Sequence, residues 1–348
     1  MQTFKSLRAV AVGACVAVAL AACGGGGGSA APTQAATGDW NSVLAAADAE
    51  GGVMLYSSQN PTRLEALKAA FNKAYPKISM QFVRGTDGDL NPKIEVEKRT
   101  GKGTADVHMV TDAAYIQNAA KSGQYSVDVR GPAFDAAAYD RAKNVINNKF
   151  FRTSAAVFAM GWNTKAVPEG FKDPKEMLNE KYAGKIGIVN PQGIASYVDF
   201  YRFYEKNFGP TFLEQLATFK PRIYPSALGV AQALTSGEII AAPGVQPLVA
   251  EVASGAPVNW ALPTPAWGTP WYTQVLVAAP HPNAAQVLAN FMVTPEGQAA
   301  LNAGYASVIK VEGSVSDASE VPLPDPAELT PEKVKAYQAY WESLFLKR

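Results

Sequence analysis

Short apolar segments alternate with segments of helical spacing along most of the chain after residue 52. Residues 53–57 and 107–110 are short apolar runs typical of buried strands, and residues 78–82 alternate apolar and polar side chains as a half-buried strand does. Residues 64–74 repeat apolar side chains at helical spacing, after Asn60-Pro61 as a helix start. The order of strand, helix and strand predicts an open sheet with helices on both faces.

A second series of the same kind begins after Asn163. Residues 185–189 and 239–242 are predicted strands, and helical spacing follows each of them. The predicted strands at residues 154–162 and 273–279 separate the two series, so we interpret them as crossovers. We therefore predict an α/β fold with two lobes, each an open, mostly parallel sheet flanked by helices, and a ligand cleft between the lobes.

The N-terminus has the pattern of a secretory signal. Lys5 and Arg8 precede an apolar run at residues 9–22, which is too short to span a membrane, and Cys23 and a glycine run follow it. This pattern resembles a bacterial lipobox, which implies that Cys23 is lipidated and becomes the new N-terminus. The alternative is an ordinary signal peptide with an incidental cysteine. The predicted divisions are residues 1–23 as signal, 24–38 as flexible linker, 39–153 with 275–348 as the first lobe, and 154–274 as the second lobe.

Composition excludes several classes of function. The 31 Lys and Arg residues nearly balance the 30 Asp and Glu residues, so neither nucleic acid nor an anionic membrane surface is an implied partner. Cys15 and Cys23 both precede the folded part, which therefore has no thiol for a disulfide, a metal or catalysis. Only His108 and His281 are histidines, so we expect no metal site of the usual His/Cys kind and no cofactor. The sequence contains no G-x-S-x-G, H-E-x-x-H or P-loop motif.

Six segments, in this order and spacing, carry a resemblance to a known family. They are Val53-Met-Leu-Tyr-Ser57, Gly103-Thr-Ala-Asp-Val107, Gly161-Trp-Asn163, Tyr182-Ala-Gly184-Lys-Ile-Gly-Ile188, Ala231-Gln-Ala-Leu234-Thr-Ser-Gly237 and Ala289-Asn-Phe-Met292-Val-Thr-Pro-Glu296. The chain resembles the extracytoplasmic solute-binding proteins of ABC importers, in the two-lobed type II class that includes ferric-ion binders. The resemblance implies a hinged, monomeric capture protein, not an enzyme. It also implies a location in the periplasm or at the cell surface, and delivery of a small solute to membrane permease and ATPase subunits.

The candidate solute-binding residues follow strands, because ligands of doubly wound sheets bind at the carboxyl ends of strands near helix N-termini. After the first-lobe strands they are Ser57, Ser58, Gln59, Arg84, Thr86 and Asp112, and the rule also selects Asp87 and Thr111 in the same loops; in the second lobe they are Asn190, Ser196, Tyr197 and Gln246; and Trp271 and Tyr272 precede a crossover. Several of them have a purely structural alternative. Ser57, Ser58 and Asp112 can simply cap helices, Tyr197 can pack in a core, and the aromatic pair can pack beneath the hinge.

The solute is predicted to be an organic anion, because backbone N–H groups at several of these loops favour a carboxylate or phosphonate. The alternative is ferric iron or an iron chelate. Ferric binders of this family use adjacent tyrosines after a second-lobe strand and often a histidine in the first loop. Here residues 243–247 contain no tyrosine and residues 57–60 no histidine, although Tyr197 and Tyr272 could supply phenolates from elsewhere. A polyamine, a sugar or a thiamine-like cation also stays open, as do an extracytoplasmic enzyme and a structural lipoprotein.

Overall fold

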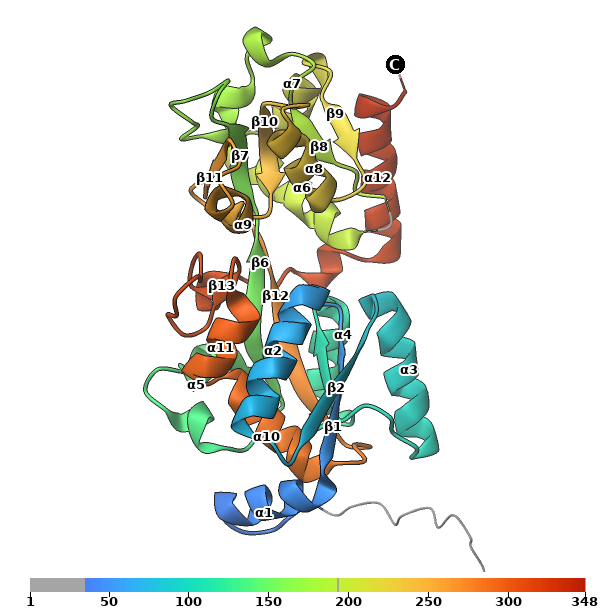
Figure 1. The fold of residues 1–348 in the computed structure, drawn as a ribbon. Helices are drawn as coiled ribbons and strands as arrows, with labels where there is room; N and C mark the ends of the chain where they lie inside the picture. Colours follow the sequence, from blue (N-terminus) through green and yellow to red (C-terminus); the bar gives the residue numbers. More distant parts are fainter. Residues whose placement is uncertain (1–34, 193, 348) are drawn as a thin grey trace, which may run out of the picture. The chain divides into compact units, whose positions relative to one another are not determined.

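The computed structural model describes residues 35–192 and 194–347 (Figure 1). The predicted signal, the lipidation of Cys23 and most of the predicted linker lie outside these residues. The first described helix, α1 (Trp40–Glu50), begins after the cap residue Asp39, whose carboxylate accepts from the Ser42 N–H, and it packs against α10 (Pro282–Met292). No helix in the described part of the chain is long and apolar enough to cross a membrane.

Three parallel strands form the N-terminal half of the larger sheet. β1 (Gly52–Ser57) lies between β2 (Ser79–Arg84) and β3 (Val107–Val110), and it runs parallel to both, as the strand and helix order predicts. The helices that follow these strands are α2 (Pro61–Ala74), α3 (Asp87–Thr100) and α4 (Ala113–Ser122). The side chains of Asn60, Thr86 and Asp112 accept backbone N–H groups at the three helix starts, so the predicted caps at Asn60 and Asp112 are confirmed.

The strands that return to this sheet run antiparallel to it. β12 (Gly268–Leu276) pairs with β3 on one side and with β6 (Phe150–Val157) on the other, giving the order β13-β6-β12-β3-β1-β2. The edge pieces are β4 (Ser126–Val127), β5 (Val145–Ile146), after the short helix α5 (Arg141–Asn144), and β13 (Ala306–Ser307). The α/β prediction is confirmed, but the sheet is mixed. The predicted parallel arrangement holds for β1 to β3 only. It fails for β6 and β12, because local pattern does not reveal the direction of a strand that returns from far along the chain.

A second group of strands follows directly from the first. β7 (Ala159–Asn163) continues from β6 after Phe158 alone, and it pairs antiparallel with β10 (Ala241–Val245) and β11 (Val258–Ala261) (Figure 1). β8 (Gly187–Val189) and β9 (Arg222–Tyr224) form a parallel pair. The helices of this group are α6 (Ala195–Phe208), α7 (Phe212–Thr218), α8 (Ala227–Ser236) and α9 (Val249–Ala253).

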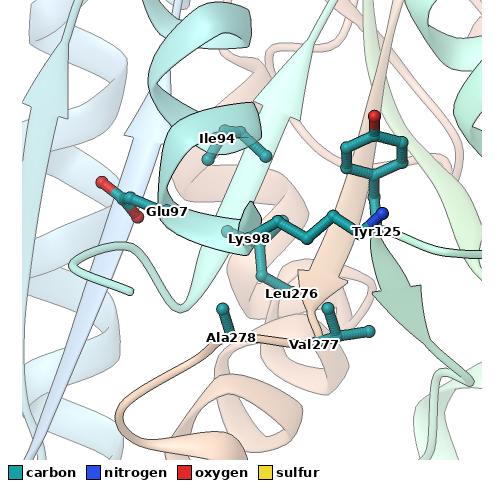
Figure 2. Close-up of a pocket in the computed structure, with 7 residues that line it drawn as sticks. All are labelled: Ile94, Glu97, Lys98, Tyr125, Leu276, Val277 and Ala278. Atoms are coloured by element: carbon teal, nitrogen blue, oxygen red, sulfur yellow. The ribbon is translucent and has the colours of Figure 1, made fainter. Parts of the chain in front are cut away.

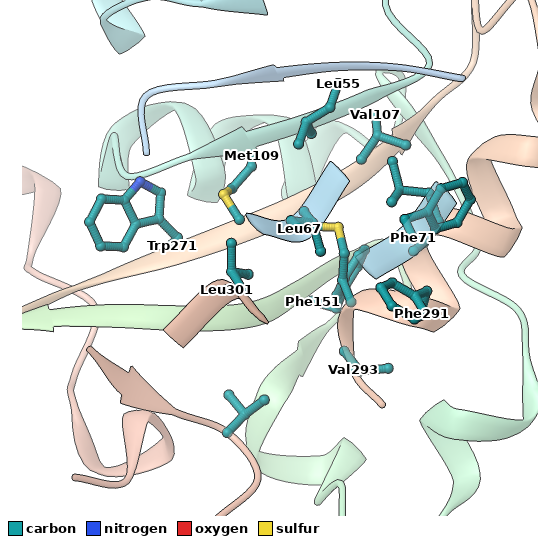
Figure 3. Close-up of a cluster of buried hydrophobic side chains, with 14 of the residues drawn as sticks. Leu55, Leu67, Phe71, Val107, Met109, Phe151, Trp271, Phe291, Val293 and Leu301 are labelled. Atoms are coloured by element: carbon teal, nitrogen blue, oxygen red, sulfur yellow. The ribbon is translucent and has the colours of Figure 1, made fainter. Parts of the chain in front are cut away.

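Separate hydrophobic cores lie beneath the two groups of strands. The first core contains Leu55, Phe71, Phe151 and Trp271, and Figure 3 shows these side chains gathered between the larger sheet and its helices. The second core begins at Phe158, one residue beyond the end of β6. At this point the Phe158 N–H donates to the carbonyl of Trp267 over 3.0 Å, so both crossover segments leave the larger sheet together.

The C-terminal helices divide between the two cores. α10 and α11 (Pro295–Asn302) pack on the larger sheet, whereas α12 (Pro331–Phe345) packs against α6 and α7. Trp341 is fully buried in the second core, with its ring 6.0 Å from that of Tyr201. The predicted first lobe, which ran from residue 275 to the C-terminus, therefore differs from the packing of α12. Sequence spacing alone does not decide which core the last helix joins.

Candidate solute-binding site

The carboxyl ends of β1, β2 and β3 bring Ser58, Asp87 and Thr111 together. Thr111 donates its backbone N–H to Asp87 Oδ2 over 2.9 Å and its hydroxyl to the same oxygen over 2.5 Å. Burial raises the pKa of Asp87, and hydrogen bonds from Thr111 and from the Ser58 hydroxyl oppose that rise by stabilising the carboxylate. The strand-end rule therefore locates these loops correctly, and it selects both Asp87 and Thr111.

The second oxygen of Asp87 is buried and accepts no hydrogen bond from the described residues. One helical turn further along α3, the side-chain oxygen of Asn91 is also buried and without a donor. The amide nitrogen of Asn91 donates to Asp112 Oδ2 over 3.2 Å, while Asp112 Oδ1 accepts the Tyr115 N–H. Hydrogen-bond acceptors thus gather at the N-termini of α3 and α4, and no ion pair of the described residues involves Asp87 or Asp112.

Trp271 links this acceptor cluster to a second group of polar residues. Its indole N–H donates to the Ser58 hydroxyl over 3.3 Å, and its ring lies edge-on to Tyr305 with centroids 5.7 Å apart. Burial raises the pKa of Tyr305, whereas hydrogen bonds with Gln246 and Asn60 and the positive charge of Arg63 lower it. Because Asn60 follows β1 and Gln246 follows β10, the Tyr305 hydroxyl lies where segments from both groups of strands meet.

Arg63 is the cation of this second group. It lies in the first turn of α2, three residues after the cap residue Asn60, and its side chain is half-buried. No hydrogen bond or ion pair of its guanidinium is found among the described residues, and its positive charge acts on the Tyr305 hydroxyl. A guanidinium in this position can bind a carboxylate or phosphate through two parallel hydrogen bonds.

Six of the predicted site residues join these two groups, namely Ser58, Asp87, Thr111, Asp112, Gln246 and Trp271. Several others are occupied in the fold. Ser57 is buried, donates to the sulfur of Met109 and accepts the Gln59 N–H. Gln59 is fully buried, and its side-chain nitrogen has no partner among the described residues. Thr86 caps α3 in a reciprocal capping box with Asp89, and Arg84 is exposed.

The second-group residues are also held by backbone contacts. Asn190 Oδ1 accepts the Gln192 N–H over 2.9 Å, and the Tyr197 hydroxyl accepts the Ala227 N–H over 3.2 Å. Ser196 is half-buried in the first turn of α6, a helix whose cap residue Ile194 provides no side-chain acceptor. The first turn of α6 therefore lacks the side-chain cap that α2, α3 and α4 have.

The structure places Tyr272 in the core. Its hydroxyl accepts hydrogen bonds from the Arg152 guanidinium at 3.2 Å and 2.7 Å, and its ring packs with Val110, Ile116 and Phe150. The prediction that Tyr272 contacts solute does not fit this position, because neighbouring residues of a strand point to opposite faces of the sheet and Trp271 occupies the other face. The phenols of Tyr272 and Tyr197 belong to different clusters, so the structure does not bring them together as an iron-binding pair.

Arg63 and Tyr305 are the residues that sequence reasoning missed. Arg63 lies three residues after the cap residue Asn60, on the same side of α2, and this spacing is the one weak sequence signal for it. Tyr305 gave no signal, because it reaches the site through β13, a strand of two residues paired with β6.

Two cavities of the described structure are lined by other residues. One has a volume of about 10 Å³, room for a single water molecule, and lies beneath α3 among Ile94, Lys98, Tyr125 and Leu276 (Figure 2). The other, of about 420 Å³, is lined by residues of α7 and its surroundings, including Lys175 and Phe212. Among the residues that the structure describes, no group of three or more His, Cys, Asp or Glu side chains could hold a metal ion.

The family described as "Bacterial extracellular solute-binding protein" has a sequence profile that matches residues 66–323. The chain belongs to this family. Members of this extracellular solute-binding family serve ABC transporters and are not enzymes; they deliver small solutes to permease and ATPase subunits, and the predicted general function is confirmed. No curated protein matches the sequence.

Solved structures of similar fold support the same architecture for this solute-binding protein. Iron-bound HitA from Pseudomonas aeruginosa is 19% identical with a TM-score of 0.62, over 85% of this chain and 99% of that chain. The substrate binding protein of an ABC transporter from Agrobacterium tumefaciens is 16% identical with a TM-score of 0.68, over 86% and 96%. AfuA from Actinobacillus pleuropneumoniae, with fructose-6-phosphate bound, is 18% identical with a TM-score of 0.58, over 84% and 98%. The predicted two-lobed, type II periplasmic-binding-protein fold is confirmed.

Proposed function

We propose that this solute-binding protein captures a small organic anion where Ser58, Arg63, Trp271, Tyr305 and Gln246 meet, between two hinged lobes. The observation that carries the proposal is the environment of the Tyr305 hydroxyl. The side chains of Asn60, after the first strand of the larger sheet, and of Gln246, after a strand of the other group, both act on this hydroxyl and lower its pKa. Arg63, which is half-buried and whose guanidinium has no partner among the described residues, lies beside it and supplies the positive charge.

An anion fits this environment better than ferric iron does. A hard ferric ion requires several anionic oxygen ligands. The polar groups around Tyr305 are instead the neutral amides of Asn60 and Gln246 and the positively charged guanidinium of Arg63. A carboxylate or phosphate can instead accept from Arg63, from the amides of Asn60 and Gln246, and from the phenol. The uncapped first turn of α6, with Ser196, offers further donors from the second lobe.

Hinge closure in this proposal occurs where both crossover segments leave the larger sheet. The Phe158 N–H donates to the carbonyl of Trp267 there, and their rings are 4.9 Å apart. The first lobe then comprises residues 39–153 with 275–330, and the second comprises 154–274 with α12. The solute binds first to the residues after β1, and closure brings the residues after β10 onto it. The solute stabilises the closed state because its affinity for that state is higher.

The location of the protein is part of the proposal. The basic, then apolar N-terminus that ends at Cys23 supports a signal peptide and a lipid anchor. The anchored monomer would then hold its solute in the periplasm or at the cell surface, close to the permease. Mass spectrometry of protein purified from its own host tests the anchor, because lipidation and cleavage leave Cys23 as a diacylated N-terminus.

The test of the function compares two arginines at the same edge of the larger sheet. Arg63 lies in the first turn of α2, and Arg84 is the last residue of β2. Native mass spectrometry and metal analysis of protein purified from its own host identify any bound solute. Arg63→Gln should lower affinity for that solute at least tenfold, because a charged hydrogen bond is lost. Arg84→Gln, at the exposed end of β2, is the matched control and should leave affinity unchanged. Bound iron, or equal affinity in both variants, would refute the organic anion at this site.

A further inference from the structure

We propose that the captured anion also carries a protonated amine, which binds the free side-chain oxygens of Asp87 and Asn91. The proposal rests on the proposed function, because it places the amine and the anionic group on one solute. The relevant site is the acceptor cluster at the N-termini of α3 and α4, which consists of Asp87, Asn91 and Asp112.

Asp87 is a carboxylate whose Oδ1 receives no hydrogen bond from the described residues, although the Ser58 hydroxyl lies close enough to stabilise its charge. Oδ2 accepts both donors of Thr111, whereas Oδ1 is buried and has no partner among the described residues. A fold that needed Asp87 only to connect α3 to β3 would be served by one oxygen. Leaving a buried charged oxygen without a donor costs free energy, and a ligand that donates to it removes this cost.

Asn91 presents its oxygen, and not its nitrogen, as the free group. Its nitrogen donates to a carboxylate oxygen of Asp112, which can only accept, so the orientation of the amide is set. The free oxygen is buried as well. Asp87 and Asn91 are four residues apart on α3 and therefore lie on the same face of the helix. Two bare acceptors on one face suit a group that carries several N–H donors.

The charges around these oxygens select a cation over a neutral donor. The negative charge of Asp112 acts on Asp87, and no lysine, arginine or histidine forms an ion pair with either residue in the described parts of the chain. An ammonium group has three donors and one positive charge, so it satisfies both free oxygens and the excess negative charge together.

A chain of residues in contact connects the acceptor cluster to Arg63. Ser58 lies at Asp87 and accepts from the Trp271 N–H, the Trp271 ring contacts Tyr305, and the Tyr305 hydroxyl lies beside Arg63. Trp271 thus lies between a site for a cation, at Asp87, and a site for an anion, at Arg63. A zwitterionic solute, with an amine at one end and a carboxylate or phosphonate at the other, matches both sites.

Calorimetric titration with matched probes tests the inference. The probes are β-alanine, 4-aminobutyrate and 3-aminopropylphosphonate, each paired with the same molecule without its amino group. We expect at least one amino compound to bind tenfold more tightly than its partner. Asp87→Asn and Asn91→Ala should each reduce that ratio, whereas Arg63→Gln should weaken both members of the pair. Asp89→Asn, in the exposed first turn of the same helix, is the control and should keep the ratio.

Two variants guard against a folding defect, because Asp87 also connects α3 to β3 while the free oxygen of Asn91 makes no such contact. Equal binding of amino compounds and their partners, or an unchanged ratio in both variants, would overturn the inference and leave the proposed function intact. Stabilisation by Na⁺, K⁺ or Ca²⁺ alone that depends on Asp87 would replace the amine by an inorganic cation. If no probe binds, the solute from native mass spectrometry decides: one without a basic nitrogen overturns the inference, and the absence of any solute refutes the proposed function too.

Discussion

The indole N–H of Trp271 donates to the hydroxyl of Ser58 over 3.3 Å, although 213 residues separate them in the sequence. The contact is possible because β12 returns to the larger sheet beside β3, which itself pairs with β1. It places an aromatic ring from a crossover strand against the loop after the first strand. A residue near the proposed hinge is thereby connected to the residues proposed to hold the solute.

Trp271→Phe tests this contact. The substitution keeps an aromatic ring and removes the N–H donor, and a single hydrogen bond contributes about 1 kcal/mol, so we expect solute affinity to fall about fivefold. Trp162→Phe, buried in the second core, makes the same change at an indole N–H that has no partner among the described residues, and serves as the control. The control should lower thermal stability without changing affinity. An unchanged affinity for Trp271→Phe would show that the hydrogen bond to Ser58 does not contribute to solute binding.

Tyr305 and Tyr272 are expected to differ sharply on loss of the hydroxyl. Tyr305→Phe removes the group that joins Asn60 and Gln246, so affinity should fall between fivefold and a hundredfold, measured by calorimetry. Tyr272→Phe leaves the buried guanidinium of Arg152 with fewer acceptors and should cost about 1–3 kcal/mol of stability, with capture unchanged. The reverse pattern would return Tyr272 to the site, as the sequence alone suggested.

Trp341 tests the attachment of the C-terminal helix. The side chain is fully buried against Tyr201, and a buried tryptophan replaced by alanine typically costs about 3–5 kcal/mol. We expect Trp341→Ala to lower the unfolding temperature of the second core, followed by calorimetry because the two cores can unfold separately. Leu346→Ala, at a residue 51% exposed near the end of the same helix region, should have little effect. A loss confined to the first core would show that α12 belongs there.

His108 makes stability depend on pH. Burial lowers the pKa of His108 to about 3, from an ordinary value of 6.5, because its fully buried ring disfavours the charged form. Below pH 6.5 the unfolded chain binds this proton and the folded chain does not, so the free energy of unfolding falls by about 1.4 kcal/mol per pH unit down to the folded pKa. Above pH 6.5 the contribution is complete.

The measurement for His108 is urea unfolding between pH 7.5 and 4.5. His108→Asn should unfold with a pH slope smaller by one proton in this range, since carboxylates contribute equally to both proteins. Asn can keep a hydrogen bond to Gln274, which lies 3.2 Å from the His108 ring nitrogen. Parallel pH profiles for the two proteins would mean that His108 titrates alike in the folded and unfolded chains.

Much of the local structure follows from short-range pattern. Ser226 and Thr294 accept backbone N–H groups at the starts of α8 and α11, as their positions before helical spacing predict, and Gly237 ends α8 in the left-handed conformation. The loops after β1 to β3 were identified as a site region because parallel strands place their carboxyl ends at one edge. Within those loops, however, Ser57 turned inward to Met109 while Ser58 faced Asp87.

The sequence by itself determined the order of strands and helices, the helix caps and the loops in which polar residues gather, because each depends on neighbours within a few residues. The tertiary structure alone decided that β12 and β6 return antiparallel, that Trp271 meets Ser58 while Tyr272 meets Arg152, and that Tyr305 joins Asn60 to Gln246. Those contacts join residues far apart in the chain. Their partners are selected by the burial of whole sheets and helices, and no local spacing records that selection.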